Sequence, residues 1–119
     1  MKSWKISVVV VVVLLACAVT AGAAEKFGVK VYDGAKYDAS NSKSVSQMMS
    51  TDAACYRTND AAAKVIAFYK KQPGLKYTGG SEQHAMFIKG AVHVTVQNPW
   101  MDMKSGKMIK ETLISIVKQ

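Results

Sequence analysis

One segment of the chain carries apolar residues at helical spacing. Within residues 60–72 the apolar positions lie three or four residues apart: Ala62, Val65, Ile66 and Tyr69. This period is typical of a helix that buries one face. Asp60 precedes the stripe as a candidate N-cap, and Pro73 follows it as a residue that cannot continue a helix. The pattern predicts a helix over residues 60–72.

Other segments alternate between apolar and polar residues with the period of a half-buried strand. The predicted strands are 25–32, 53–58, 75–88 with a break at Gly79-Gly80, 91–97 and 112–117. A second, short helix is predicted over residues 42–50, because Val45, Met48 and Met49 keep helical spacing. A further hairpin is expected between Met101 and Ile109, with its tip near Ser105-Gly106.

Lys89-Gly90 separates two apolar runs and predicts a tight hairpin turn. With these two residues as the turn, Met86 faces His93, and His84 faces Thr95. One side of the hairpin is then apolar and should meet the helix: Ala85, Phe87, Val92, Val94 and Val96. The opposite side is mixed: His84, Met86, Ile88, Ala91, His93, Thr95 and Gln97.

Together these elements predict an α+β fold. We expect a mostly antiparallel sheet of about five strands, with the main helix (about 60–72) packed on one face. Residues 25–119 are enough for one domain with a single modest core. Since one helix cannot cover both faces of such a sheet, the other face should remain accessible.

The first 24 residues have the pattern of a signal peptide. Lys2 and Lys5 precede a run over 6–16 that is apolar except for Ser7, and the small residues 21–24 offer a cleavage site after Ala23 or Ala24. The run is about half as long as a membrane-spanning helix requires. A second interpretation remains open, because Leu14-Leu15-Ala16-Cys17 is similar to a lipobox whose cysteine becomes the lipidated N-terminus. Either interpretation predicts a periplasmic or secreted protein, with membrane attachment only through Cys17.

The charge and the cysteine content of the chain bear on whether it binds nucleic acid and whether it can form a disulfide. The chain has 16 Lys and Arg against 8 Asp and Glu. Two of the lysines fall in the predicted signal peptide, so the remainder carries 14 positive against 8 negative residues, a formal charge of +6. Nucleic acid is not expected as a partner, because the protein is predicted to be exported and its lysines are scattered. Cys55 would be the one cysteine left, either buried and free or paired with another chain.

The mature part of the chain resembles a group of small exported bacterial proteins with a "pGa … T.D … vv.FYkk.lG" pattern. The likeness is carried by Tyr32-Asp-Gly-Ala-Lys36, Tyr56-Arg-Thr-Asn-Asp60 and Lys64-Val-Ile-Ala-Phe-Tyr-Lys-Lys71. These motifs are fold markers. The resemblance therefore implies an α+β sheet with one packed helix, and it implies no activity.

Candidate metal ligands lie on the mixed side of the hairpin. In the expected register His84 and His93 are diagonal neighbours and Met86 faces His93, so imidazole and thioether donors would suit copper. This soft-metal site is the alternative hypothesis. Met101, Met103 and Met108 of the second hairpin are expected mainly as core filling and hairpin packing. Soft metal ligands or an oxidation-sensitive contact surface are the alternatives.

The sequence contains no motif for catalysis or cofactor attachment: it lacks C-x-x-C, C-x-x-C-H, G-x-S-x-G and a phosphate-binding glycine loop. No enzyme activity and no cofactor are expected. The main hypothesis is an exported, non-catalytic binding or accessory module whose partner is an envelope protein or an anionic envelope component. Its expected contact surface comprises Ile88, Thr95, Trp100, Lys104 and Lys107, beside Met86 and His93.

Overall fold

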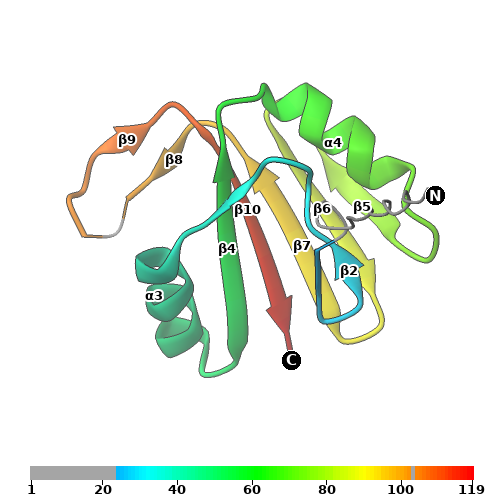
Figure 1. Cartoon of the computed structure of the whole chain (residues 1–119), viewed down its shortest axis with the longest axis horizontal. Coiled ribbons are helices and arrows are strands. Elements are labelled where there is room, and N and C mark those ends of the chain that lie inside the picture. Colours follow the sequence, from blue (N-terminus) through cyan, green and yellow to red (C-terminus); the bar gives the residue numbers. More distant parts are fainter. Residues whose placement is uncertain (1–23, 103) are drawn as a thin grey trace, which may run out of the picture.

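The computed structural model describes residues 24–102 and 104–119, so residues 1–23 of the predicted signal peptide, including Cys17, lie outside this part. The main feature is a six-stranded antiparallel sheet with strand order β3-β4-β10-β7-β6-β5 (Figure 1). Its strands are β3 (Lys36–Tyr37), β4 (Asp52–Thr58), β5 (Lys76–Gly80), β6 (His84–Lys89), β7 (Val92–Gln97) and β10 (Thr112–Lys118). The α+β class is confirmed, and the sheet has one strand more than expected.

Two short ribbons accompany the sheet: β1 (Glu25–Lys26) with β2 (Val29–Lys30), and β8 (Trp100–Met101) with β9 (Met108–Ile109). The continuous strand predicted over 25–32 is wrong. Phe27 and Gly28 both have positive φ, 54° and 81°, and turn the chain back on itself. Two consecutive residues of this kind form the tight turn of a hairpin, so the alternation of Phe27, Val29 and Val31 belongs to two strands.

Helix α3 (Ala39–Met49) begins earlier than predicted, because Asp38 caps it by accepting a hydrogen bond from the Asn41 backbone N–H at 2.9 Å. Helix α4 (Ala62–Lys70) is shorter than predicted at both ends. Asp60 is not its N-cap. The Asp60 carboxylate instead accepts a hydrogen bond from the Tyr32 hydroxyl at 2.6 Å, which ties the loop before α4 to the N-terminal segment.

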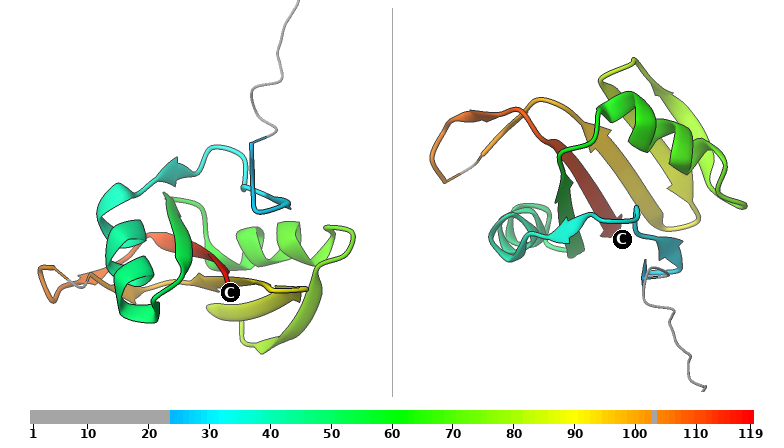
Figure 2. Two further views of the ribbon diagram at one scale, coloured as in Figure 1. Left: turned by 90° about the horizontal axis from the view of Figure 1, so that it is seen from below. Right: turned by 45° about the horizontal axis from the view of Figure 1, so that its top comes forward.

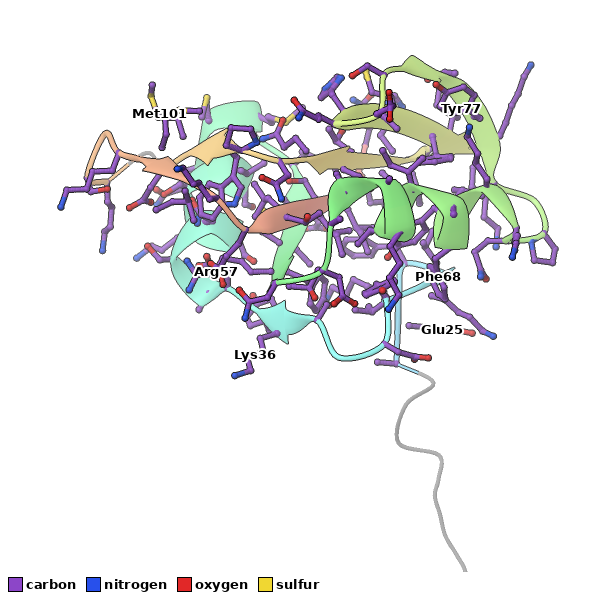
Figure 3. The ribbon with its side chains drawn as sticks, turned by 90° about the horizontal axis from the view of Figure 1, so that it is seen from above. Glu25, Lys36, Arg57, Phe68, Tyr77 and Met101 are labelled. Atoms are coloured by element: carbon purple, nitrogen blue, oxygen red, sulfur yellow. The ribbon has the colours of Figure 1, made fainter. Side chains whose placement is uncertain are left out.

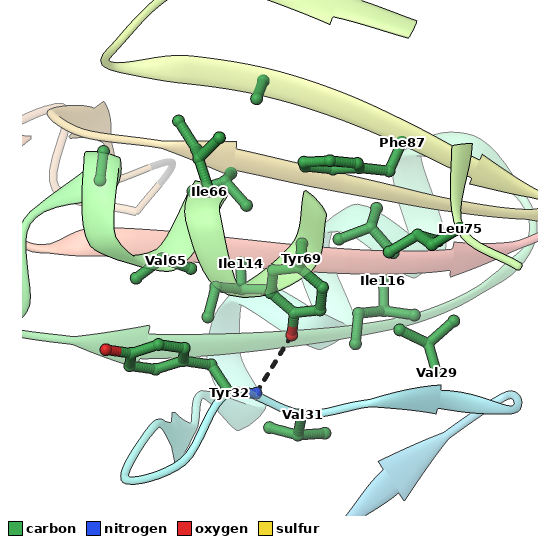
Figure 4. Close-up of a cluster of buried hydrophobic side chains, with 14 of the residues drawn as sticks. Val29, Val31, Tyr32, Val65, Ile66, Tyr69, Leu75, Phe87, Ile114 and Ile116 are labelled. Atoms are coloured by element: carbon green, nitrogen blue, oxygen red, sulfur yellow. Dashed lines mark hydrogen bonds between the residues drawn. The ribbon is translucent and has the colours of Figure 1, made fainter. Parts of the chain in front are cut away.

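The main core lies between one face of the sheet and two covering elements, α4 and the N-terminal segment that contains β2 (Figure 2). Val65, Ile66 and Tyr69 of α4 pack on the sheet with Phe87 and Ile114 (Figure 4). The predicted burial of Phe87 and of Val92, Val94 and Val96 on this side is confirmed. The Tyr69 hydroxyl accepts a hydrogen bond from the buried backbone N–H of Tyr32 at 3.1 Å.

A second, smaller cluster lies on the opposite face and consists of Cys55, Trp100 and Leu113, with Val45 and Ile109 against them. Val45 belongs to α3, and Trp100 and Ile109 belong to the β8–β9 ribbon. The expectation that one helix covers one face and leaves the other free is therefore wrong for the β4 end of the sheet. Strands β7 and β6 lie farther from β4, on the other side of β10, and β5 forms the opposite edge.

The outer edge of β4 is covered rather than free. Its Cys55 backbone N–H donates to Ser42 Oγ at 2.7 Å, and the Cys55 carbonyl accepts from the Asp38 backbone N–H at 2.8 Å. Short β3 pairs with the next residues, Tyr56 and Arg57. Helix α3, its N-cap Asp38 and strand β3 thus bind backbone N–H and C=O groups of β4 that could otherwise pair with a strand of another chain.

Candidate functional site

The β6–β7 hairpin forms the part of the far face that α3 does not reach, since α3 packs beside β4 (Figure 2). Met86 is 41% exposed there, and Ile88, His93 and Thr95 are half-buried. The expected open face is thus smaller than predicted but carries the predicted residues. It combines thioether, aliphatic and imidazole groups that a contacting molecule can reach.

The register of this hairpin differs from the expected one. Lys89 pairs with Val92, so Gly90 and Ala91 form the turn, and Gly90 supplies the positive φ of 60°. Every side chain keeps its predicted face, because moving the turn by one residue shifts each cross-strand partner by two positions.

The changed register separates the two histidines. His84 pairs with Gln97 and His93 pairs with Ile88, which places the histidines four residues apart along the hairpin, about 14 Å at 3.4 Å per residue. Met86 faces Thr95 rather than His93. The diagonal His84–His93 pair that motivated the copper hypothesis is therefore not formed. Among residues 24–102 and 104–119, no group of three or more His, Cys, Asp or Glu side chains is close enough to hold a metal ion.

Methionine has an unusual distribution in this protein. The five methionines in the described part of the chain are exposed: Met48, Met49, Met86, Met101 and Met108. The buried hydrophobic residues of that part include no methionine. Core filling by Met101 and Met108 is therefore wrong. Met103 lies outside the described residues.

Trp100 does not belong to an accessible surface. It is only 2% exposed, packs with Cys55 and Leu113, and has the Arg57 guanidinium 5.8 Å from its ring centroid. Its expected role as a partner contact is wrong, because the ring fills the space between the ribbon and the sheet. The indole Nε1 is buried and has no hydrogen-bond partner among the described residues.

Lys104 and Lys107 lie near the tip of the β8–β9 ribbon and are exposed, as expected. The carboxylate of Asp102 accepts a hydrogen bond from the Ser105 hydroxyl at 2.7 Å. This bond, together with backbone N–H groups, lowers the pKa of Asp102. The tip therefore presents its ammonium groups outward while its one carboxylate is engaged within the turn.

A polar pocket of about 560 Å³ was not expected from the sequence. It lies where the loops before α3 and α4 meet Glu111, and it gathers four of the chain's eight acidic residues: Asp33, Asp38, Asp60 and Glu111. The Nε atom of Arg57 lies 3.6 Å from Asp38 Oδ2 and 3.5 Å from Glu111 Oε1. The only usable signal was the position of these acids beside predicted element ends. Their meeting depends on the β4–β10 pairing, which no local pattern specifies.

Cys55 is fully buried, and burial raises the pKa of its thiol. Its sulfur lies 3.6 Å from Ser115 Oγ on β10. Strand β7, which carries His93, lies beyond β10 and thus about 10 Å from β4. The thiol therefore lacks the adjacent imidazole that would activate it as a nucleophile.

Comparisons with known protein families, with curated proteins and with solved structures find no match to this chain. The resemblance to small exported bacterial proteins therefore stays a prediction. In the part of the chain that the structure describes, no helix is long and apolar enough to cross a membrane.

Proposed function

We propose that this protein is an exported, non-catalytic binding module of the bacterial cell envelope. Its working surface is the far face of β6 and β7, with the basic tip of the β8–β9 ribbon as a second contact. The observation that carries this proposal is that no methionine of the described residues lies in the core, while Met86 on β6 and Met101 and Met108 on the ribbon are exposed.

Exposed methionine supports a contact role on physical grounds. Its side chain is unbranched and polarizable, so it adapts to the shape of a partner and is over-used at binding surfaces. On the β6–β7 face, Met86 stands among Ile88, His93 and Thr95, which are half-buried. Covering such a surface removes apolar area from water at about 25 cal/mol per Å².

The chemistry of the remaining polar groups agrees with binding rather than reaction. Burial raises the pKa of the Cys55 thiol and so favours its protonated form, and its hydrogen-bonding neighbours, Ser115 and Ser42, are hydroxyls. In the polar pocket the Arg57 guanidinium lies between two carboxylates, and this arrangement suits charge balance better than proton transfer.

Site-specific photocrosslinking in cells tests the proposed surface. A benzophenone amino acid replaces Thr95 on the open face, and the matched control places it at Ala67, which is exposed on α4. We expect envelope-dependent crosslinks from position 95 that are missing from position 67. Equal products at both positions, or none at position 95, would contradict the proposed surface.

Export is tested separately by the intact mass of the protein from the envelope fraction. Cleavage after Ala23 or Ala24 gives an unmodified N-terminus, whereas cleavage before Cys17 gives a lipid-modified one. A chain that retains residues 1–24 in the cytoplasm would overturn the proposed location without affecting the fold.

A further inference from the structure

The β8–β9 ribbon is apolar on both faces, and only one of these faces is covered by the rest of the described chain. Trp100 pairs with Ile109, and both contact the second cluster. Met101 pairs with Met108, and successive residues of a strand point to opposite faces, so these two side chains share the outer face. They are 57% and 55% exposed.

The inner pair fixes the direction of the outer pair. Trp100 is held between the cluster around Cys55 and the guanidinium of Arg57. Figure 3 shows Met101 and Arg57 on opposite sides of the ribbon. The ribbon extends from one end of the sheet (Figure 1).

Three exposed lysines lie in the ribbon or directly after it: Lys104, Lys107 and Lys110. No ion pair joins any of them to a carboxylate within the described ranges. The local carboxylate, Asp102, is occupied by the Ser105 hydroxyl and backbone groups. The ribbon thus carries an exposed apolar pair together with three exposed lysines.

We propose that the outer face of the β8–β9 ribbon binds the surface of an anionic phospholipid bilayer. Met101 and Met108 enter the boundary between head groups and acyl chains, while the lysine ammonium groups contact lipid phosphates. Apolar insertion and basic residues are the two contributions that together give stable peripheral attachment. The inference rests on the proposed function, because it names one envelope component that this part of the surface binds.

Charge decides in favour of a bilayer over a protein partner. The proposed mature chain has a formal charge of +6, and three exposed lysines in one ribbon complement an extended anionic surface rather than one carboxylate. Each lysine near such a membrane contributes a factor of about five in affinity. Removal of all three should therefore weaken binding about a hundredfold.

Vesicle co-sedimentation tests this inference with residues 25–119, which contain every residue of both apolar clusters. The vesicles contain either phosphatidylcholine alone or phosphatidylcholine with 30% phosphatidylglycerol. We expect binding to the anionic vesicles alone, weakened by salt. The triple variant Lys104→Ala/Lys107→Ala/Lys110→Ala should lose about a hundredfold in affinity, and Met101→Ser/Met108→Ser about tenfold.

Matched controls remove the same groups elsewhere. Lys36→Ala/Lys43→Ala/Lys71→Ala lowers the net charge equally, and Met48→Ser/Met49→Ser removes two exposed methionines from the end of α3. Both controls should bind anionic vesicles within about threefold of the parent. Far-UV circular dichroism of every variant reports whether it is folded.

Three results would overturn the inference: no vesicle binding, equal binding to neutral vesicles, or an equal loss in the control variants. An equal loss in the lysine control would mean that net charge alone attracts the protein, and an equal loss in the methionine control would mean that any exposed methionine contributes. If vesicles are not bound but position 95 still crosslinks to an envelope protein, the lipid inference fails and the proposed function stands. If the protein neither binds vesicles nor crosslinks from position 95, both the lipid inference and the proposed function are rejected.

Discussion

The hydrogen bond between the Tyr69 hydroxyl and the Tyr32 backbone N–H offers a direct test of how the N-terminal segment is held. Both groups are buried, and the N···O distance is 3.1 Å. Tyr69→Phe keeps the ring in the core but leaves the Tyr32 N–H without an acceptor. An unsatisfied buried N–H costs about 1–3 kcal/mol, so we expect the free energy of unfolding to fall by about 2 kcal/mol. At 4–8 °C per kcal/mol for a domain of this size, Tm should fall by about 10 °C.

Urea denaturation of Tyr69→Phe measures this loss, and hydrogen exchange at the Tyr32 amide locates it. Tyr77→Phe is the matched control, because Tyr77 is 40% exposed and its hydroxyl makes no hydrogen bond within the described chain. The control should change stability by less than about 0.5 kcal/mol. A similarly small effect of Tyr69→Phe, with unchanged exchange at Tyr32, would refute the proposed role of this bond.

Three other predictions concern buried groups. Burial and the hydrogen bond to Asp60 raise the pKa of Tyr32 to about 12, above its unfolded value of about 10. The free energy of unfolding should therefore fall as pH rises from 10 to 12. In urea titrations, Tyr32→Phe should show a smaller fall over this range. The buried Cys55 thiol should react with a disulfide reagent only on unfolding, and prompt labelling of the native protein would contradict its placement. Trp100→Phe loses no indole hydrogen bond and should cost about 1 kcal/mol, whereas Trp100→Ala should cost about 3–5 kcal/mol by thermal denaturation.

Side-chain periodicity was sufficient to predict the elements that form the main core. The spacing of Val65, Ile66 and Tyr69 fixed the buried face of α4, and alternation placed Phe87 and Val94 beneath it. These predictions held because a helix and a strand each have a fixed period, whichever partners they meet. The turn of the β6–β7 hairpin differs from the predicted one, but each side chain of β6 and β7 still lies on the predicted side of the sheet.

Features that depend on tertiary contacts were not predictable in this way. Asp60 is a residue type that often caps helices, but here its carboxylate accepts a hydrogen bond from the Tyr32 hydroxyl instead of capping α4. Trp100 has the character of a surface anchor, but the ribbon folds it onto Leu113 and Cys55. The polar pocket around Arg57 likewise joins residues that lie far apart in sequence.

The candidate site shows the same division. The partly exposed side of β6 and β7 followed from alternation, whereas the separation of His84 from His93 followed from the turn. The outward pairing of Met101 with Met108 required knowing which face of the ribbon packs on the sheet. The local sequence pattern predicts which side chains share a face of a strand. Packing between distant segments determines which of these faces remains exposed.

The position of β10 has a consequence for the order in which this chain becomes structured. Strand β10 lies between β4 and β7, although it follows both in sequence. A nascent chain that ends before residue 112 holds two separate half-layers with no shared hydrogen-bond ladder. The complete six-stranded sheet can therefore form only after residues 112–118 have been synthesised.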